Sequence, residues 1–347
     1  MTEAVAALAA YRLADAPIEV DSWSALMDEA DRHHLIGVLA AAVDDDAVAP
    51  GPDPARLELS AQHEALMVAT MNLERTLLAV AEVLDAAAVP LRVLKGPALA
   101  HTVALDPSHR TFGDVDVLVP GELIEGAVAA LIDAGAVRPS PELAPGYDRR
   151  FAKSVTLVWD GHEVDVHRTL APGPFGLRID QPSLWAGASS FELGGRMLAT
   201  LDRERHLVHG CYHAVLGDIE PRLASLRDIA LLADARALDH DVVRDLARCW
   251  QGEAVLAEGL RRTAAALPGR TGGLYDWAAE RTPSAADRAA FDSYRTEHRR
   301  FARQSLASLR AIDGWGDRAA FVRAVVWPSR AHLDARDLSR RRHLLRR

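Results

Sequence analysis

The sequence has little of what a secreted or membrane-embedded protein requires. It contains only two cysteines, Cys211 and Cys249, which are far apart and match no disulfide or metal-site spacing, so we expect free, buried or half-buried thiols. No apolar run approaches the roughly 20 residues that cross a bilayer. No basic segment followed by an apolar run marks a leader near the first residue. These absences predict a cytoplasmic protein without a membrane segment.

Basic charge is also in deficit. The chain has 40 lysines and arginines against 49 aspartates and glutamates, a formal net charge of −9. Binding along a nucleic-acid backbone depends on clustered Lys and Arg side chains. The balance therefore argues against a nucleic-acid partner and favours a small molecule or a peptide. The exception is SRRRHLLRR, residues 339–347, whose five arginines could meet an acidic partner, although a solvated or frayed end is the simpler interpretation.

Changes of pattern divide the 347 residues into three regions. Residues 1–88 are expected to form an N-terminal helical region, in which residues 55–88 carry no Pro or Gly and predict one long helix. Residues 89–200 combine short apolar or alternating runs with helical segments and predict an α/β core. Helical periodicity then returns, so residues 201–347 are expected to form a C-terminal helical domain. We find no internal repeat.

The middle region predicts strands and helices in succession. The run DVDVLV, residues 114–119, begins with strict alternation and is closed by Pro120 and Gly121. The following helix has Gly135 as its expected C-terminal cap. SVTLVWDGHEVDVHRTL, residues 154–170, predicts a β-hairpin, because Asp160-Gly161 is a favoured two-residue type I′ turn. The predicted fold class is α+β, a small mixed sheet with helices on one side, flanked by N-terminal and C-terminal helical regions.

Two aspartates in the first strand indicate a metal site. Side chains alternate along a strand, so Asp114 and Asp116 share one face while Val115 and Val117 enter the core on the other. Carboxylates this close repel each other unless a cation lies between them, and Mg²⁺ prefers such hard oxygen ligands. The structural alternative is that acids on an edge strand block aggregation.

A third acid is available on the second arm of the hairpin. Glu163, Asp165 and His167 share one face of that arm. If the arm lies near the strand at residues 114–119, Asp165 completes a three-carboxylate cluster that fits two-metal phosphoryl transfer. On the same face, His167 is better suited to orienting a carboxylate than to direct catalysis.

Basic and flexible residues upstream suit a phosphate. Lys95 supplies a cation, and Gly96 lets backbone N–H groups approach an anion at the start of the next helix. Lys95 and Arg110 could instead form salt bridges with the acids, a role that needs no nucleotide.

Taken together, these residues resemble a known family. Lys95-Gly96 after an apolar run, then Arg110, then residues 113–119 (GDVDVLV) and finally residues 165–167 (DVH) are similar to the uncharacterised nucleotidyltransferase family of the DNA polymerase β-like superfamily. The segments LVHGCYHAVLGDIEPRLASLRDIALL and VVWPSR also look like its helical C-terminal part. The chain departs from the wider superfamily at Gly96-Pro97, where Gly-Ser is usual, and Pro97 offers a phosphate neither a hydroxyl nor an N–H.

The resemblance implies a polymerase β-like core and a Mg²⁺-dependent transfer of a nucleoside monophosphate from an NTP. The acceptor would be a hydroxyl of a small molecule, a peptide or a protein, and pyrophosphate would be released. Asp114, Asp116 and Asp165 would be the catalytic residues and would bind two Mg²⁺ ions. The nucleotide would lie against the remaining candidates, Lys95, Gly96, Arg110, Gly113, His167 and His213.

Two other classes stay open. Pro97 favours a catalytically degenerate nucleotide-binding regulatory module of the same fold, and the acids could also form a purely structural Ca²⁺ or Mg²⁺ site. A separate zinc site at His206, His209 and His213, which share a helical face, is not favoured. The glutamate of the zinc-protease helix motif is missing there, so packing or a supporting contact is the better interpretation.

Overall fold

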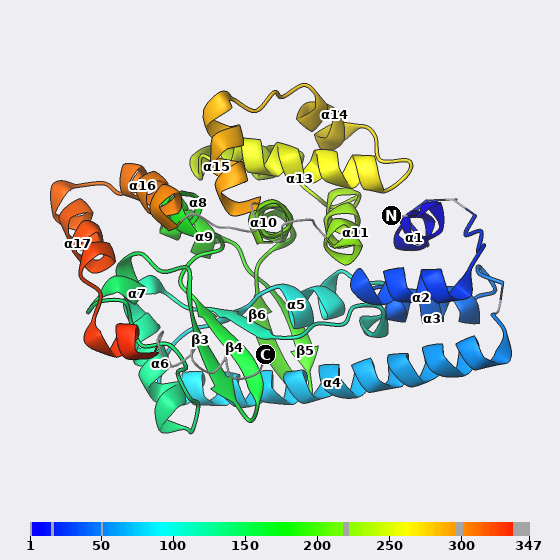
Figure 1. Cartoon of the computed structure of the whole chain (residues 1–347), viewed down its shortest axis with the longest axis horizontal. Coiled ribbons are helices and arrows are strands. Elements are labelled where there is room, and N and C mark those ends of the chain that lie inside the picture. The colour runs from blue at the N-terminus through cyan, green and yellow to red at the C-terminus, as the bar shows by residue number, and fades with distance from the viewer. Residues whose placement is uncertain (1, 15–16, 50, 218–221, 296–300, 336–347) are drawn as a thin grey trace.

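The centre of the molecule is a six-stranded mixed β-sheet enclosed by helices (Figure 1). The computed structural model describes residues 2–14, 17–49, 51–217, 222–295 and 301–335. The strand order is β3-β4-β2-β1-β6-β5. The strands span β1 Arg92–Val93, β2 Val115–Leu118, β3 Ser154–Trp159, β4 His162–His167, β5 Ser189–Leu193 and β6 Arg196–Thr200. The predicted α+β class is confirmed.

Helices precede, interrupt and follow this sheet. The first group is α1 Glu3–Ala9, α2 Trp23–Arg32, α3 Ile36–Asp44 and α4 Asp53–Ala86. Between the strands lie α5 Lys95–Thr102, η1 Pro107–His109, η2 Gly121–Leu123, α6 Ile124–Asp133, α7 Tyr147–Arg150, α8 Gly173–Leu177 and α9 Gln181–Ala186. The last group is α10 Arg203–Tyr212, the π-helical turn η3 His213–Gly217, α11 Leu223–Ala233, α12 His240–Cys249, α13 Glu253–Ala266, α14 Gly273–Ala279, α15 Ala285–Arg295, α16 Phe301–Ala311 and α17 Trp315–Val326.

The predicted long helix is α4, whose 34 residues extend about 50 Å. Its second half buries Leu73, Leu77, Val80 and Leu84 against the sheet, while Leu59 in the first half belongs to the core formed with α2 and α3. Figure 1 shows α4 running from below those helices to below the strands. One helix therefore ties the N-terminal helices to the sheet.

Both β-hairpins turn on two residues with left-handed backbone. The predicted β3–β4 hairpin is confirmed, since Asp160 (φ 49°) and Gly161 (φ 81°) connect the two strands as a type I′ turn requires. The β5–β6 hairpin was not predicted. Its turn is Gly194 (φ 56°) and Gly195 (φ 79°), a Gly-Gly pair that is itself a hairpin signal. This hairpin supplies β6, the parallel neighbour of β1.

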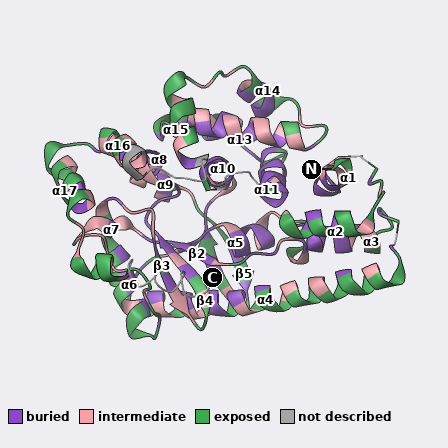
Figure 2. Ribbon diagram, in the orientation of Figure 1, coloured by how far each residue is buried: buried purple, intermediate pink, exposed green. Residues whose placement is uncertain are grey.

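The expectation of helices on one side of the sheet is wrong, because both faces are covered. On one face Val115, Val117, Val164 and Val166 form an apolar core with residues of α4 and α6. On the other face, Leu118 belongs to the larger core that includes the C-terminal helices. The purple, buried positions in Figure 2 accordingly run through the sheet and into the helices above it. A sheet alternating between valine and polar residues gives no signal for this second layer.

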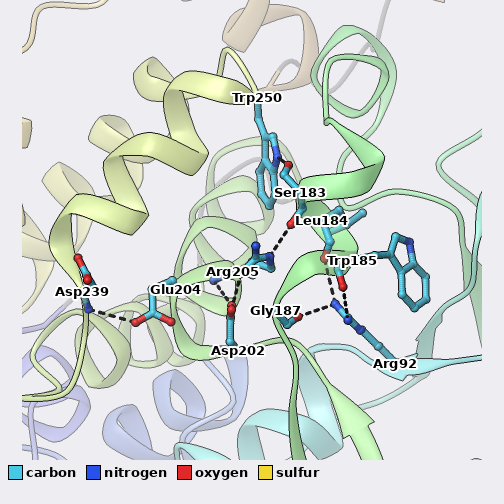
Figure 3. A network of polar contacts seen from close by, with 10 residues as sticks. All are labelled: Arg92, Ser183, Leu184, Trp185, Gly187, Asp202, Glu204, Arg205, Asp239 and Trp250. Carbon is cyan, nitrogen blue, oxygen red and sulfur yellow. Dashed lines mark hydrogen bonds and ion pairs between the residues drawn. The ribbon is translucent and has the colours of Figure 1, made fainter.

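A buried arginine network anchors the C-terminal helices to the sheet (Figure 3). Arg92 of β1 donates to the carbonyl oxygens of Leu184, Trp185 and Gly187 at 2.6–3.0 Å, and its guanidinium stacks on the Trp185 ring. From α10, Arg205 bonds the carbonyl oxygen of Ser183 at 2.7 Å and pairs with Asp202. Arg92 of β1 and Arg205 of α10 thus both bond the segment at residues 183–187. This shared segment fixes the position of α10 above the sheet.

Both cysteines are free; Cys211 is buried, but Cys249 is exposed rather than buried or half-buried. Across the described ranges, no helix combines the length and apolarity that crossing a bilayer demands. The arginine-rich segment at residues 339–347 lies outside the described residues.

Candidate active site

Three potential metal ligands gather on the polar face of β2 and β4. The two strands are parallel, and their register puts Asp116 directly opposite Asp165. Oxygens of these two carboxylates and a ring nitrogen of His167 all lie within 4.8 Å of one another. The two carboxylates fit a divalent cation such as Mg²⁺, which prefers hard oxygen ligands and would offset their mutual repulsion. The inferred proximity of the hairpin arm to the Asp-Val-Asp strand is thus observed.

Asp116 is the most constrained of the acids. Its side chain is 1% exposed, with Oδ2 at 2.7 Å from Lys95 Nζ and Oδ1 at 2.6 Å from His167 Nε2. Burial alone would raise the pKa of Asp116, but the neighbouring Lys95 and His167 outweigh it and hold the pKa well below its ordinary value. Asp116 is therefore a carboxylate anion. Its ion pair with Lys95 is the salt bridge that the sequence offered as an alternative to phosphate contact.

Asp114, just before β2, lies beside the set of three rather than within it. Burial, and then the nearby charge of Asp116, raise its pKa, with Lys95 acting in the opposite sense. The like-charge repulsion expected from the Asp-x-Asp spacing is thus present. A cation at the site would relieve it.

His167 is oriented by a second hydrogen bond. Its Nδ1 faces the carbonyl oxygen of Thr169 at 3.2 Å, which requires a hydrogen on Nδ1 and directs Nε2 at the carboxylates. A backbone carbonyl on one ring nitrogen is the usual support of a histidine that ligates a metal through the other. His167 was expected among the nucleotide-binding residues; its geometry suits orienting Asp116 or binding the ion.

The glycines predicted to approach a phosphate differ in environment. Gly96 lies in the first turn of α5, where an added Cβ would come within 2.8 Å of the Phe112 ring, so packing alone requires glycine there. Around Gly113 an added Cβ would meet nothing within 4 Å, and its backbone is not left-handed. The space beside Gly113 is therefore open.

Arg110 pairs with an acid outside the set of three. Its Nε bonds Asp228 of α11 at 2.9 Å, and its Nη1 donates to the carbonyl oxygen of Thr111. Arg110 thus fixes the loop before β2 to the C-terminal helices. The sequence suggested a salt bridge as the alternative to phosphate contact, but gave no sign that Asp228 would be the partner.

The histidines of α10 and η3 are neutral. His206 is buried and bonds Thr200 Oγ1 at 2.8 Å, and burial lowers its pKa to about 3. His213 is half-buried; burial, and then Lys95 and Lys153, hold its pKa well below the ordinary value. The two lysines that act on the acidic cluster therefore also act on His213, as expected if this helix covers the site, whereas His206 serves packing.

Two side chains near the acids were not singled out from the sequence. Thr156 of β3 donates to Asp165 Oδ1 at 2.5 Å. Lys153, just before β3, interacts electrostatically with Lys95 and with all three aspartates. Composition carries a signal for the second, because the chain contains only two lysines, Lys95 and Lys153.

The site therefore combines acids on neighbouring parallel strands of a mixed sheet, a lysine at the start of a helix and a helical layer above. The chain belongs to the family described as uncharacterised nucleotidyltransferase, which matches residues 19–268, well over half of the sequence. No protein among the curated ones compared with the chain matches it.

Three solved structures are similar to part of the chain. A crystal structure of ANT(2")-Ia in complex with adenylyl-2"-tobramycin is 15% identical, with a TM-score of 0.37 over 51% of this chain and 96% of that one. A solution structure of the antibiotic-resistance factor ANT(2'')-Ia is 15% identical, with a TM-score of 0.39 over 56% and 98%. An antigenic nucleotidyltransferase-like protein from Paracoccidioides brasiliensis is 14% identical, with a TM-score of 0.33 over 57% and 94%. At these scores the similarity says nothing about substrates.

Proposed function

We propose that the protein moves a nucleoside monophosphate from an NTP to a hydroxyl group of a small molecule, peptide or protein and releases pyrophosphate. The observation that carries this proposal is the pairing of Asp116 with Asp165 on parallel strands, with His167 within reach of the same ion. Membership of the nucleotidyltransferase family supports it. We further propose that the reaction takes place in the cytoplasm, with NTP as the donor.

Asp114, Asp116 and Asp165 would hold two Mg²⁺ ions, with His167 supporting Asp116. When bound, Mg²⁺ supplies positive charge to the phosphates and makes a nearby hydroxyl more acidic. Lys95 stays close to Asp116 and lies at the start of α5, so it would also face the phosphate tail of the nucleotide. The open space beside Gly113, the neighbour of Asp114, would leave room for that nucleotide.

In the proposed transfer one bond to the α-phosphorus forms and one breaks, and a side chain of this protein accepts the proton. The acceptor oxygen forms a bond to the α-phosphorus, and its proton passes to Asp165. The bond between the α-phosphorus and the oxygen bridging to the β-phosphate breaks, and pyrophosphate leaves with that electron pair. Thr156 donates to one oxygen of Asp165, which leaves the other oxygen available for the acceptor hydroxyl or the ion.

The strand order suggests where the acceptor lies. Lys95 follows β1 and therefore lies on one side of the acids. The strand on their other side, beyond Asp165 of β4, is β3. A cavity of about 610 Å³ lies at that edge, with Thr156 and Glu163 in its wall together with Tyr147 and Leu333. Its volume would hold a small molecule or the end of a peptide. We propose this cavity as the acceptor side.

A catalytically degenerate nucleotide-binding module is the second candidate. Pro97 removes an N–H from the first turn of α5, and Lys95 is already paired with Asp116. Such a protein would bind an NTP but would release no pyrophosphate. The intact set of three acids favours turnover.

Thermal unfolding with each of the four NTPs, with and without Mg²⁺, tests the proposal without a known acceptor. We expect a Mg²⁺-dependent rise in Tm that prefers one NTP and disappears in a variant carrying both Asp114→Asn and Asp116→Asn. The absence of a rise with any NTP would refute NTP binding. Incubation with candidate acceptors should then yield products heavier by one nucleotide, and binding without such products or pyrophosphate would favour the degenerate module.

A further inference from the structure

Both lysines of this protein lie near the acidic cluster. Of its 40 basic residues only Lys95 and Lys153 are lysines, and the rest are arginines. The ion pairs among described residues use arginine or histidine as the cation, except Lys95 with Asp116. Both lysines nevertheless lie beside the same aspartates. Lysine is a compact point charge, whereas arginine offers a planar fork, so the choice suggests a ligand for which a compact cation is needed.

The two lysines reach the acids from opposite sides. Lys95 follows β1, and the N–H of the adjacent Leu94 bonds the carbonyl oxygen of Asp116. Lys153 precedes β3, where the next residue, Ser154, is the register partner of His167. Because β2 and β4 lie between β1 and β3, the Asp116–Asp165 pair separates the two points of entry.

Lys153 also differs from Lys95 in having no carboxylate of its own. In the described part of the chain, its ammonium makes no ion pair and no hydrogen bond, although the side chain is half-buried. Burial, and then repulsion by Lys95, lower the pKa of Lys153. A partly buried cation that lies near another cation and contacts no carboxylate directly is stabilised by an anion that binds there. A lysine that served only to neutralise the aspartates would contact one of them.

We propose that Lys153 binds the α-phosphate of the NTP, the phosphate that is transferred, from the β3 side of the acids. This inference rests on the proposed nucleotidyl transfer. The reacting phosphate must lie over Asp116 and Asp165, and the β- and γ-phosphates extend toward Lys95 and the start of α5. Lys153, on the far side of the acids, reaches the non-bridging oxygens of the α-phosphate and not the tail. In this role the Lys153 ammonium donates hydrogen bonds to these oxygens and transfers no proton.

Nucleotides of different length test this assignment. Dissociation constants of the Mg²⁺ complexes of the preferred NMP, NDP and α,β-methylene NTP analogue, and of pyrophosphate, would be measured by calorimetry for wild type and Lys153→Met. Loss of a charged hydrogen bond to the α-phosphate should weaken all three nucleotides by a similar factor, about 10-fold or more. Pyrophosphate, which has no α-phosphate, should bind as in the wild type.

Matched variants separate binding from folding. Arg149→Met removes a cation four residues away whose side chain is half exposed and lies 3.9 Å from Glu125, and it should bind every ligand as the wild type does. Lys153→Arg keeps the charge and should recover part of the lost affinity. If Lys153→Met unfolds, the comparison of nucleotide lengths is made with Lys153→Arg and Lys153→Gln.

The possible results distinguish the inference from the function. A wild type that binds no nucleotide overturns both. A wild type that binds Mg²⁺-NTP while Lys153→Met binds all ligands equally well overturns only the role of Lys153. Weaker binding of pyrophosphate and NTP with unchanged NMP also overturns it, because that pattern belongs to a cation on the phosphate tail.

Discussion

Replacing Asp116 by asparagine or by alanine separates the effect of its charge from the effect of its hydrogen bonds. In Asp116→Asn the amide oxygen can accept from Lys95, and the amide nitrogen can donate to Nε2 of His167, whose other nitrogen keeps its hydrogen toward Thr169. Both bonds then lose the charge of the carboxylate, a difference of roughly 1 kcal/mol for each bond, so we expect a loss of about 2 kcal/mol in the free energy of unfolding. Asp116→Ala removes both bonds and leaves Lys95 buried without a partner, which should cost about 3–5 kcal/mol.

Urea unfolding at pH 7 without Mg²⁺ measures both costs, and pyrophosphate release from NTP measures turnover. The asparagine variant should fold, bind Mg²⁺-NTP poorly and turn over at background rate. Equal destabilisation by asparagine and alanine would show that the two hydrogen bonds are not preserved as described. Turnover near the wild-type rate in Asp116→Asn would remove Asp116 from the reaction and with it the proposed function.

Three further predictions concern pH, packing and metal. Because the pKa of His206 falls from 6.5 to about 3 on folding, the unfolded chain binds more protons below pH 6.5. The free energy of unfolding should therefore decrease as the pH is lowered, and His206 should account for a loss of about 2 kcal/mol at pH 5. The His206→Gln variant, measured by urea unfolding, should lose correspondingly less stability between pH 7 and pH 5. Gly96→Ala should lower the free energy of unfolding by about 1–3 kcal/mol, because the added Cβ meets the Phe112 ring. Gly113→Ala should leave that free energy unchanged and weaken only NTP binding. Equal stability of the two variants would contradict the packing argument. Mg²⁺ alone should raise Tm in the wild type, with EDTA reversing the rise, and an unchanged Tm would mean that the acids bind no ion at millimolar concentration.

The parts of the site that the sequence predicted are those determined by local geometry. Alternation places Asp114 and Asp116 on one strand face and Asp165 with His167 on another, and the Asp160-Gly161 turn fixes the register of the hairpin. The remaining step was the pairing of β4 with β2. That pairing is long-range, and the resemblance to a nucleotidyltransferase family, rather than periodicity, suggested it.

The parts that the sequence did not predict depend on partners far away in the chain. Arg110 bonds Asp228, 118 residues later, and no local pattern marks either residue as the other's partner. The second helical layer rests on Arg92, which bonds carbonyl oxygens of residues 184–187. Backbone carbonyls are present at every residue, so a sequence cannot reveal which of them an arginine will bind.

The departure at Pro97 and the position of Lys153 bear on the same question, how this site would bind a phosphate. A proline in the first turn of α5 leaves that turn with one N–H fewer for an anion, and the helix has no capping side chain. Binding through backbone donors is therefore weaker here than at a helix start with a serine. A second lysine on the opposite side of the acids supplies three donors and a full charge. If Lys153 contacts the α-phosphate, the chain has replaced donors on the phosphate tail with a cation at the reacting phosphorus, where charge develops during transfer. Loss of pyrophosphate affinity would then be no obstacle to the proposed transfer, since pyrophosphate would be the product that must leave.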